Sequence, residues 1–366
     1  MAETSRKARI GIIGTGWWAT EAHLPAIKAH EDGEVVAICD TRPERLNLAA
    51  ETFDITNLYS DYHEILARET MDGIIVVTPH ATHYDITRDC LEQGLHVLLE
   101  KPMTLYAKHA RALVELAEKN RRELIIGYPY HYYPPIKKAR EVIQGGELGP
   151  VQYVTSSFST NVFNFLNGGV APDASPTSYK VQGPSEDYNS PELLGGGEGH
   201  LQITHSAAMM FFITGLRAKK VHALMHNHGL NVDLIDTMTV EFEDDALGMV
   251  GGTGNAGKNY RLAMSIYCEQ GCLVTDTMAR IGVIRRPDGS EEELFKRPEH
   301  PRGEGRSRER RDYPTTRNFI EVILGREENG SPAEVGWRTV ELLDAAYRSA
   351  NADGNGVYIS DLYTQG

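Results

Sequence analysis

Cysteine is scarce in this chain, with four residues among 366. Cys39, Cys90, Cys268 and Cys272 are too few and too scattered for a disulfide framework. Cys268 and Cys272 alone would leave a structural zinc site incomplete, because no second pair completes a tetrahedral set. We therefore expect no disulfide-stabilised scaffold and no metal site.

Long apolar runs and positive charge are lacking as well. A mean hydropathy of −0.37 and the absence of any apolar run of about 18 residues argue against a membrane span. Residues 1–9 are polar and lead into a strand-like run without a signal-peptide core, so we expect a soluble cytoplasmic protein. The formal charge of −14 disfavours nucleic acid as a partner, because binding phosphates needs a basic face.

What the chain does contain is enough length and apolar content for two packed domains. Its first third alternates short β-branched runs with amphipathic stretches such as Tyr106–Asn120. The runs that we expect to form buried parallel strands are Arg9–Gly14, Val35–Cys39, Gly73–Val77, Val97–Glu100 and Leu124–Gly127. This alternation predicts a doubly wound α/β sheet.

The pattern changes after about Gly149. Val151–Phe158 and Met238–Phe242 alternate apolar and polar residues, which predicts an antiparallel sheet with one solvated or partner-covered face. Between them, Ser159–Leu194 is rich in Gly, Pro, Asn and Ser with interleaved aromatic residues, and we interpret it as a loop that covers a substrate. The Arg-rich stretch Arg297–Arg311 is typical of a solvated or interface loop.

A glycine turn follows the first expected strand. Residues 14–19 read Gly-Thr-Gly-Trp-Trp-Ala, matching the G-x-G-x-x-A pattern of dinucleotide-binding folds. Gly14 permits the tight turn, Gly16 lets the backbone approach a diphosphate, and the small Ala19 lets helix and strand pack closely. The diphosphate would lie at the helix N-terminus, where free N–H groups favour an anion.

An acidic residue stands where such folds bind the adenosine ribose. Asp40 ends the second strand roughly 20 residues beyond the turn, and its carboxylate favours NAD over NADP. Arg42 is a guanidinium near the same ribose and would stack on adenine or meet a phosphate. We expect NAD as the cofactor, with NADP as the less favoured alternative.

Two further motifs lie at carboxyl ends of parallel strands: Thr-Pro-His-Ala-Thr-His at 78–83 and Glu100-Lys101-Pro102. Together with the glycine turn, the chain resembles the Gfo/Idh/MocA family of sugar and polyol dehydrogenases over essentially its whole length. The resemblance includes Gly127-Tyr128, the stretch 146–149 (Gly-Glu-Leu-Gly) and the triple glycine 195–197 before a helix that carries His205.

This resemblance implies an N-terminal Rossmann domain over residues 1–128. It also implies a C-terminal α/β domain over 129–366, whose open, mostly antiparallel sheet builds a homo-oligomer (dimer, tetramer or hexamer). Lys101 would be the active-site lysine beside the nicotinamide, and His205 the acid/base histidine. The residues expected to hold the cofactor are Gly14, Gly16, Trp17, Trp18, Asp40, Arg42, Thr78, Pro79, His83, Glu100 and Lys101.

Lys101 also makes chemical sense without the resemblance. Oxidation of an alcohol needs a base for the hydroxyl proton while hydride leaves to the nicotinamide. A partly desolvated lysine should have a lowered pKa and would serve as that base. Pro102 restricts the backbone of Lys101. The alternative interpretation is a surface lysine that precedes a helix-starting proline.

Two departures from the family pattern concern the substrate. The family has an Asp four residues before the histidine, but this chain has Leu201, so we expect His205 to work alone or with Gln202. His200 is a second candidate on another side of the helix. An Asn-Arg-Arg-like stretch is replaced by Tyr-Pro-Tyr-His-Tyr at 128–132, in which Tyr128 and His131 are expected to contact a sugar.

The leading hypothesis is NAD-dependent oxidation of a secondary ring hydroxyl of a sugar or glycoside. The Gly-Pro-aromatic segment and the missing Asp resemble family members that convert the C3 hydroxyl of glucosides to a 3-keto group. Alternatives are an inositol or aldose dehydrogenase, an NAD-dependent glycosidase, and a non-enzymatic NAD-binding sensor, against which the presence of Lys101 and His205 argues.

Overall fold

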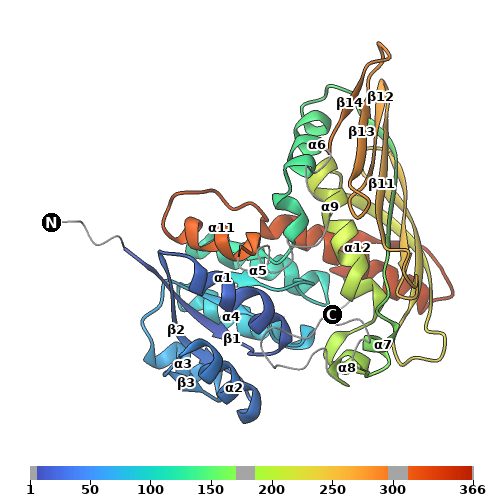
Figure 1. Ribbon diagram of the computed structural model, residues 1–366. Coiled ribbons are helices and arrows are strands. Elements are labelled where there is room, and N and C mark those ends of the chain that lie inside the picture. The colour runs from blue at the N-terminus through green and yellow to red at the C-terminus, as the bar shows by residue number, and fades with distance from the viewer. Residues whose placement is uncertain (1–5, 170–185, 296–311, 365–366) are drawn as a thin grey trace.

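The computed structural model describes residues 6–169, 186–295 and 312–364. Two units lie side by side, a parallel sheet wrapped by helices and a larger mixed sheet with helices on one face (Figure 1). The expected loop Arg297–Arg311 and much of the expected covering loop lie outside the described residues. No helix within the described residues is long and apolar enough to cross a membrane.

The first unit is built on a six-stranded parallel sheet of order β3-β2-β1-β4-β5-β6. Its strands are β1 (Ala8–Ile13), β2 (Gly33–Cys39), β3 (Leu58–Tyr59), β4 (Gly73–Val76), β5 (His96–Leu99) and β6 (Leu124–Ile126). The five expected strands are confirmed to within about two residues, because each is a buried apolar run. The chain winds to one side from β1 to β3 and to the other from β4 to β6, so a topological switch point lies between β1 and β4.

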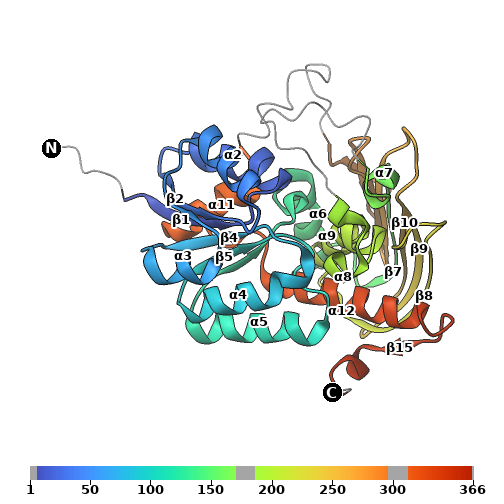
Figure 2. The same ribbon diagram turned by 90° about the horizontal axis from the view of Figure 1, so that it is seen from below.

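Helices cover both faces of this sheet (Figure 2). They are the π-helix η1 (Ala19–His23), α1 (Leu24–Ala29), α2 (Pro43–Phe53), α3 (Tyr62–Arg68), α4 (His83–Glu92) and α5 (Ala107–Asn120), with a 3₁₀ turn η2 at His80–Thr82. Helices α4 and α5 pack together on one face through Cys90, Leu91 and Leu113. The doubly wound Rossmann arrangement predicted from the sequence is confirmed.

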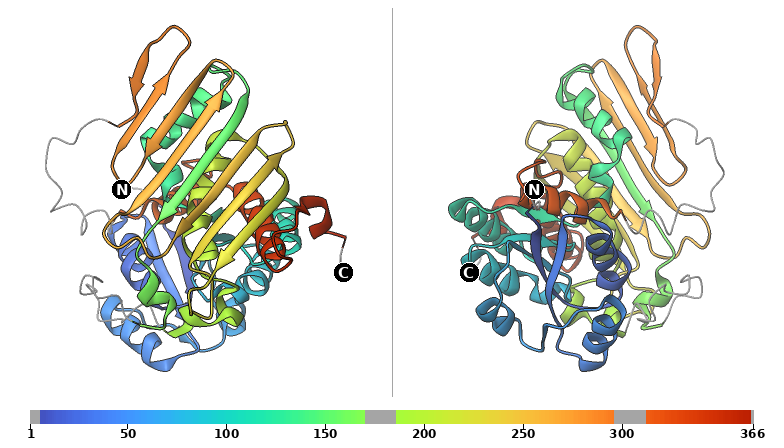
Figure 3. Two further views of the ribbon diagram at one scale, coloured as in Figure 1. Left: turned by 90° about the vertical axis from the view of Figure 1, so that its right-hand side faces the viewer. Right: turned by 60° about the vertical axis from the view of Figure 1, so that its left-hand side comes forward.

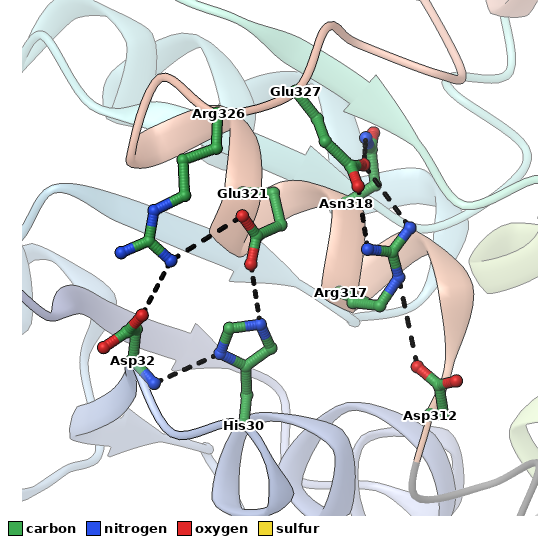
Figure 4. Close-up of polar contacts among 8 residues, drawn as sticks. All are labelled: His30, Asp32, Asp312, Arg317, Asn318, Glu321, Arg326 and Glu327. Atoms are coloured by element: carbon green, nitrogen blue, oxygen red, sulfur yellow. Dashed lines mark hydrogen bonds and ion pairs between the residues drawn. The ribbon is translucent and has the colours of Figure 1, made fainter.

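Helix α11 (Pro314–Ile323) returns from the C-terminal part of the chain to the first sheet. Phe319 and Ile320 belong to the same buried cluster as Ile10 and Ile27 of the first unit. Figure 4 shows the polar contacts beside it: Glu321 lies 2.9 Å from His30, and Arg326 lies 2.7 Å from Asp32. Helix α11, although it follows residue 128 in the sequence, therefore docks on the Rossmann unit. Its apolar face gave no sign in the sequence of which sheet it would cover.

The second unit is a nine-stranded sheet of order β14-β13-β12-β11-β7-β10-β9-β8-β15. The strands are β7 (Val151–Ser159), β8 (Ala218–His226), β9 (Ile235–Phe242), β10 (Leu247–Thr253), β11 (Arg261–Cys268), β12 (Gly271–Asp276), β13 (Ile281–Arg285), β14 (Glu291–Glu293) and β15 (Val357–Tyr358). All neighbours pair antiparallel except β7 and β10, which are parallel. The expected open, mostly antiparallel sheet is confirmed.

Helices cover one face of this second sheet and leave the other uncovered within the described residues (Figure 3). The covering helices are α6 (Pro134–Gln144), α9 (Thr204–Thr214) and α12 (Ala333–Ala350). Shorter elements complete the unit: η3 (Pro129–Tyr132), α7 (Phe163–Leu166), η4 (Glu186–Asn189), α8 (Pro191–Leu194), the π-helix η5 (Gly199–Ile203) and η6 (Ile359–Leu362). Buried residues alternate with more exposed ones along β7 and β9, as the sequence pattern of these two strands predicts.

Candidate active site

The glycine turn after β1 has the geometry that a diphosphate needs. Gly14 has a φ of +93°, and a Cβ added there would lie 2.3 Å from the carbonyl oxygen of Val77, so only glycine fits. A Cβ added at Gly16 would meet nothing closer than Arg45 Nη1 at 3.7 Å, which leaves room for a ligand against the backbone. Ala19 is fully buried at the start of η1. The turn therefore leads directly into the N-terminus of η1, the arrangement in which a dinucleotide's diphosphate would be held.

Asp40 at the end of β2 closes the turn from one side. Its Oδ2 accepts hydrogen bonds from the backbone N–H of Thr15 at 2.7 Å and from the Thr15 hydroxyl at 3.0 Å. Its Oδ1 accepts the backbone N–H of Arg42 at 2.9 Å. The carboxylate is therefore held rigidly at the position that the sequence assigns to ribose recognition, and it also ties the glycine turn to the end of β2.

Arg42 does not point freely toward the expected adenosine site. Its Nη2 lies 2.6 and 2.7 Å from the two carboxylate oxygens of Asp187, which comes from the second unit. Hydrogen bonding to Asp187 raises the pKa of Arg42, so the guanidinium stays charged. The sequence did not indicate this long-range ion pair.

Trp17 and Trp18 follow the turn and pack against the second part of the chain. The Trp17 ring lies 6.3 Å from Phe165, and the Trp18 ring lies 5.6 Å from Tyr313, both edge to face. The Trp18 indole N–H donates to Glu100 Oε1 at 3.2 Å. Both tryptophans thus join the two units beside the cofactor turn.

Glu100 was expected to hold the cofactor, and the structure places it behind the site. It is 6% exposed; besides the Trp18 indole, its carboxylate contacts the ring of His23 at 3.1 Å and accepts the backbone N–H of Lys101 at 3.2 Å. A Cβ at Gly127 would lie 2.6 Å from it, so that glycine makes room for the carboxylate. Glu100 therefore positions Trp18, His23 and the backbone of Lys101.

His83 likewise supports the turns rather than facing an open space. It is fully buried, with Nδ1 at 2.8 Å from the Pro102 carbonyl and Nε2 at 2.9 Å from the Thr78 carbonyl. It thereby links the turn after β4, which contains Thr78 and Pro79, to the turn after β5. Burial lowers the pKa of His83. Thr78 and Pro79 lie at the switch point next to Gly14, where a dinucleotide would pass.

Lys101 projects from the end of β5 toward the second unit. Its Nζ donates a hydrogen bond of 2.8 Å to the backbone carbonyl of Leu201, and the Lys101–Pro102 peptide bond is cis. Burial lowers the pKa of Lys101 to about 8, an effect that the nearby charges of Glu100 and Glu198 oppose. This is the perturbed, partly desolvated lysine that the sequence predicted.

The helix that carries His205 begins with a π-helical turn. The expected helix 198–213 is observed as η5 followed by α9, and such π-helical segments are frequent at functional sites. The carbonyl of Leu201 faces Lys101, while the Leu201 side chain packs in an apolar cluster with Leu166 and Leu230. Gln202 and His205 both remain partly exposed.

His205 lies among aromatic rings. The rings of Tyr128, Tyr130 and Phe158 lie 5.9, 5.7 and 6.2 Å from its own, each edge to face. Burial lowers the pKa of His205 well below its ordinary value, and the charge of Lys101 acts in the same direction. The imidazole is therefore neutral, and its Nδ1 has no hydrogen-bond partner within the described part of the chain.

Tyr128 and His131 were expected to touch the substrate, and both are buried. The Tyr128 hydroxyl lies 2.9 Å from the Thr204 hydroxyl at the start of α9. His131 is fully buried, lies 2.9 Å from the Ser331 hydroxyl and stacks on Phe212 at 4.2 Å. These contacts place both side chains under the site. Tyr130, from the same motif, is partly exposed and its ring lies 5.7 Å from that of His205, and sequence reasoning did not single it out.

A buried carboxyl group, also missed by sequence reasoning, stands at the start of η5. Glu198 is fully buried, and neither of its oxygens has a hydrogen-bond partner among the described residues. Burial and the charge of Asp233 raise its pKa well above the ordinary value, whereas Lys101 lowers it. The segment is fixed by Asp233, which accepts the backbone N–H groups of Gly197 and Gly199 at 2.7 and 2.8 Å. His200, the second histidine candidate, is buried against Tyr347 instead.

A glycine turn at the switch point and a hydrogen-bonded acid directly after β2 define a dinucleotide-binding α/β protein with a second, sheet-based domain. Two family models match this chain: "Oxidoreductase family, NAD-binding Rossmann fold" over residues 8–128, and "GFO/IDH/MocA C-terminal domain" over residues 136–274. The chain belongs to the Gfo/Idh/MocA family of oxidoreductases, and its first unit is an NAD-binding Rossmann domain.

Several curated relatives of the chain are sugar dehydrogenases. The chain is 33% identical over 149 residues to D-xylose 1-dehydrogenase (NADP(+)) 2 of Haloferax volcanii, covering 41% of this chain and 45% of the relative. It is 31% identical over 156 residues to D-glucoside 3-dehydrogenase of Escherichia coli, covering 43% of this chain and 46% of the relative. These matches therefore span less than half of either protein.

Solved structures share the whole architecture. Levoglucosan dehydrogenase in complex with NADH and levoglucosan superposes with a TM-score of 0.78 at 19% identity, covering 97% of this chain and 100% of that one. At this identity the likeness establishes the fold. The arrangement of a Rossmann unit and an open mixed sheet is thus common to both proteins.

Proposed function

We propose that this protein is an NAD-dependent dehydrogenase that oxidises a secondary ring hydroxyl of a sugar or glycoside, with the C3 hydroxyl of a glucoside as the leading substrate. The observation that carries the proposal is the meeting of Lys101 with the first turns of the His205 helix, at the carboxyl end of β5. A lysine of lowered pKa and a neutral histidine stand next to a dinucleotide-binding turn.

The two side chains are suited to removing a hydroxyl proton. Because the pKa of Lys101 is lowered to about 8, a useful fraction of the amine is unprotonated near neutral pH and accepts a proton. Neutral His205 offers a second acceptor, and its imidazole is partly exposed. The Leu201 carbonyl orients the Lys101 amine without adding a charge.

The cofactor would be held by the residues of the first unit. Gly14, Gly16 and the N-terminus of η1 fit the diphosphate, and Asp40 fits the ribose. When bound, the nicotinamide supplies the acceptor for the hydride that leaves the hydroxyl-bearing carbon. Trp17 and Trp18 close the space beside the turn with Phe165 and Tyr313, which helps to exclude water.

Aromatic and buried polar groups favour a sugar as the substrate class. Tyr130 is partly exposed and its ring lies 5.7 Å from that of His205, which suits the apolar face of a pyranose. Gln202 is partly exposed on the same helix and can donate or accept from ring hydroxyls. The absence of an acid at position 201 distinguishes the site from the pattern expected for the family and supports a glycoside rather than free inositol.

A homo-oligomer through the second sheet belongs to the same proposal. The helix-free face of that sheet carries exposed apolar side chains, including Leu224 (58%), Leu247 (55%) and Met249 (47%). Exposed apolar side chains on the uncovered face of a sheet favour burial against a second copy.

The test is NADH formation at 340 nm with NAD and NADP. Methyl and aryl glucosides, glucose, xylose and myo-inositol are compared for the wild type and Lys101→Ala. Turnover of glucosides that is lost in the variant supports the proposal. Turnover of inositol or xylose alone indicates an inositol or aldose dehydrogenase. Release of the aryl group without net NADH indicates a glycosidase instead. No turnover of any substrate despite tight NAD binding indicates a sensor.

A further inference from the structure

We propose that Asp187, contributed by the second unit, makes the cofactor site selective for NAD over NADP by engaging Arg42 and Arg45. These two arginines would otherwise offer a cationic site to the 2′-phosphate of NADP. NAD binding follows from the family to which the chain belongs. The preference for NAD over NADP that we propose depends on residues of this chain.

The geometry places one carboxylate between two guanidinium groups. Arg42 Nη2 lies 2.6 and 2.7 Å from the two Asp187 oxygens, and Arg45 Nη2 lies 3.8 Å from Asp187 Oδ2. The Asp187 side chain is 14% exposed, so water screens these ion pairs only weakly. The Asp187 carboxylate is consequently the nearest anion to both arginines in the described structure.

Both arginines lie where an adenosine ribose would be read. Arg42 stands two residues after Asp40, and its backbone N–H is bonded to the Asp40 carboxylate. Arg45 reaches back to the glycine turn, because its Nη1 is the nearest atom to a Cβ built at Gly16. An arginine at this place in a Rossmann fold accommodates the 2′-phosphate of NADP.

The charges at this corner are already balanced without a phosphate. Among the described residues, Asp40 and Asp187 supply two carboxylates against the guanidinium groups of Arg42 and Arg45. A 2′-phosphate would add further negative charge beside both acids, and it would have to break the Arg42–Asp187 contact. The 2′-hydroxyl of NAD makes neither demand, so the arrangement favours NAD.

The position of Asp187 is built into the second unit. It lies in η4, and the neighbouring Tyr188 packs against the cluster that contains Leu166 and Leu230. The next residue along, Asn189, accepts a hydrogen bond of 3.3 Å from the Asn231 side chain. A carboxylate anchored in this way persists at the site rather than moving away when a ligand arrives.

The experiment is a binding titration by quenching of the intrinsic Trp fluorescence, with NAD⁺ and NADP⁺ as the probes and no sugar present. The wild type should bind NAD⁺ at least about tenfold more tightly than NADP⁺, a difference of about 1.4 kcal/mol. Asp187→Asn and Asp187→Ser should tighten NADP⁺ binding by about tenfold or more and change NAD⁺ binding by less than about threefold. Adding Arg42→Ala to Asp187→Asn should abolish that gain.

Asp276→Asn is the matched control, because Asp276 is also 14% exposed and pairs with Arg261 on the second sheet, away from the turn. It should leave both affinities unchanged. A wild type that prefers NADP⁺, an unchanged NADP⁺ affinity in the Asp187 variants, or a parallel loss for both cofactors would overturn the proposal. Because no sugar is used, this experiment tests the NAD selectivity even if the protein does not oxidise sugars. Failure of the selectivity proposal likewise leaves the proposal of sugar oxidation untouched.

Discussion

The amine of Lys101 donates a hydrogen bond of 2.8 Å to the backbone carbonyl of Leu201, one hundred positions further along the chain. A backbone carbonyl orients an amine in either protonation state, whereas an acidic side chain would hold it charged. The leucine side chain is 6% exposed and packs among apolar residues of α7 and the 230–234 segment. At position 201, where the family pattern led us to expect an acid, the lysine amine is thus oriented by a backbone carbonyl.

Restoring the acid should harm the protein. Leu201→Asp is expected to cost about 3 kcal/mol of unfolding free energy or more, because it removes a packed leucine and places a carboxylate in an apolar cluster. Leu201→Ala, which leaves the cavity without the charge, should cost less by roughly 1 kcal/mol or more. Urea unfolding of both variants measures this. An Asp variant that is as stable as the Ala variant and more active would contradict the orientation described.

Removing the side-chain amine of Lys101 should slow catalysis strongly and leave NAD⁺ binding largely unchanged. Lys101→Ala is expected to reduce kcat by a factor of about 10² to 10⁴, the usual contribution of a general base, with NAD⁺ affinity within about threefold of wild type. The exposed Lys119→Ala on α5 serves as the control. Stopped-flow and steady-state rates at 340 nm measure the effect. If the variant keeps about a tenth or more of the wild-type activity, Lys101 is not the general base.

The oxidation rate should depend on pH through Lys101. Since burial lowers its pKa to about 8, the amine is protonated below that pH, and only the unprotonated form accepts the hydroxyl proton. At saturating NAD⁺, kcat/KM should rise with pH by about tenfold per unit below pH 8 and level off above it. A pH profile of the wild type beside His205→Ala tests the assignment. A rate that falls between pH 6 and 8 is incompatible with it.

Stability should change with pH at Glu198. Its pKa is raised by burial, so the fold favours the protonated carboxyl, and this contribution is present at low pH and lost as pH rises through the raised pKa. Glu198→Gln is neutral at every pH. Its melting temperature should match that of wild type near pH 5 and exceed it at pH 9 by roughly 2 °C or more. The exposed Glu118→Gln is the control, and a gap that shrinks with rising pH would refute the account.

The exposed face of the second sheet should hold copies together. Leu224→Glu combined with Leu247→Glu places charges on two side chains that are 58% and 55% exposed, and it should convert an oligomer to monomers in light scattering. Leu58→Glu, at a 37% exposed leucine on β3, should leave the oligomer intact. A monomeric wild type, or an oligomer that survives the double change, would show that this face is not the interface.

Much of the fold was predictable because local patterns determine it. Buried β-branched runs predicted five parallel strands, and the G-x-G-x-x-A pattern predicted the tight turn at Gly14, where the structure has a positive φ. Alternation identified the second sheet, although not the parallel pairing of β7 with β10. The return of α11 to the first sheet was missed, since one amphipathic face fits either sheet equally well.

The site was predictable where a motif fixes a backbone position and less so where distant segments meet. Lys101 was predicted as the active-site lysine because the Glu-Lys-Pro motif follows a strand and because the family resemblance implied it. Asp187 and Glu198 were missed, because no motif marks the residue that pairs with Arg42 or lies buried near Lys101. The π-turn at η5, which turns the Leu201 carbonyl toward Lys101, also has no sequence signature.

The most direct test of the central claim uses methyl glucoside labelled with deuterium at C3. After incubation with NAD⁺, the reduced cofactor is isolated and its mass is measured. The account predicts that deuterium from C3 appears in NADH, together with a 3-keto sugar, in the wild type and not in Lys101→Ala. Unlabelled NADH from the C3-labelled glucoside, or no NADH from any sugar or polyol, would contradict it.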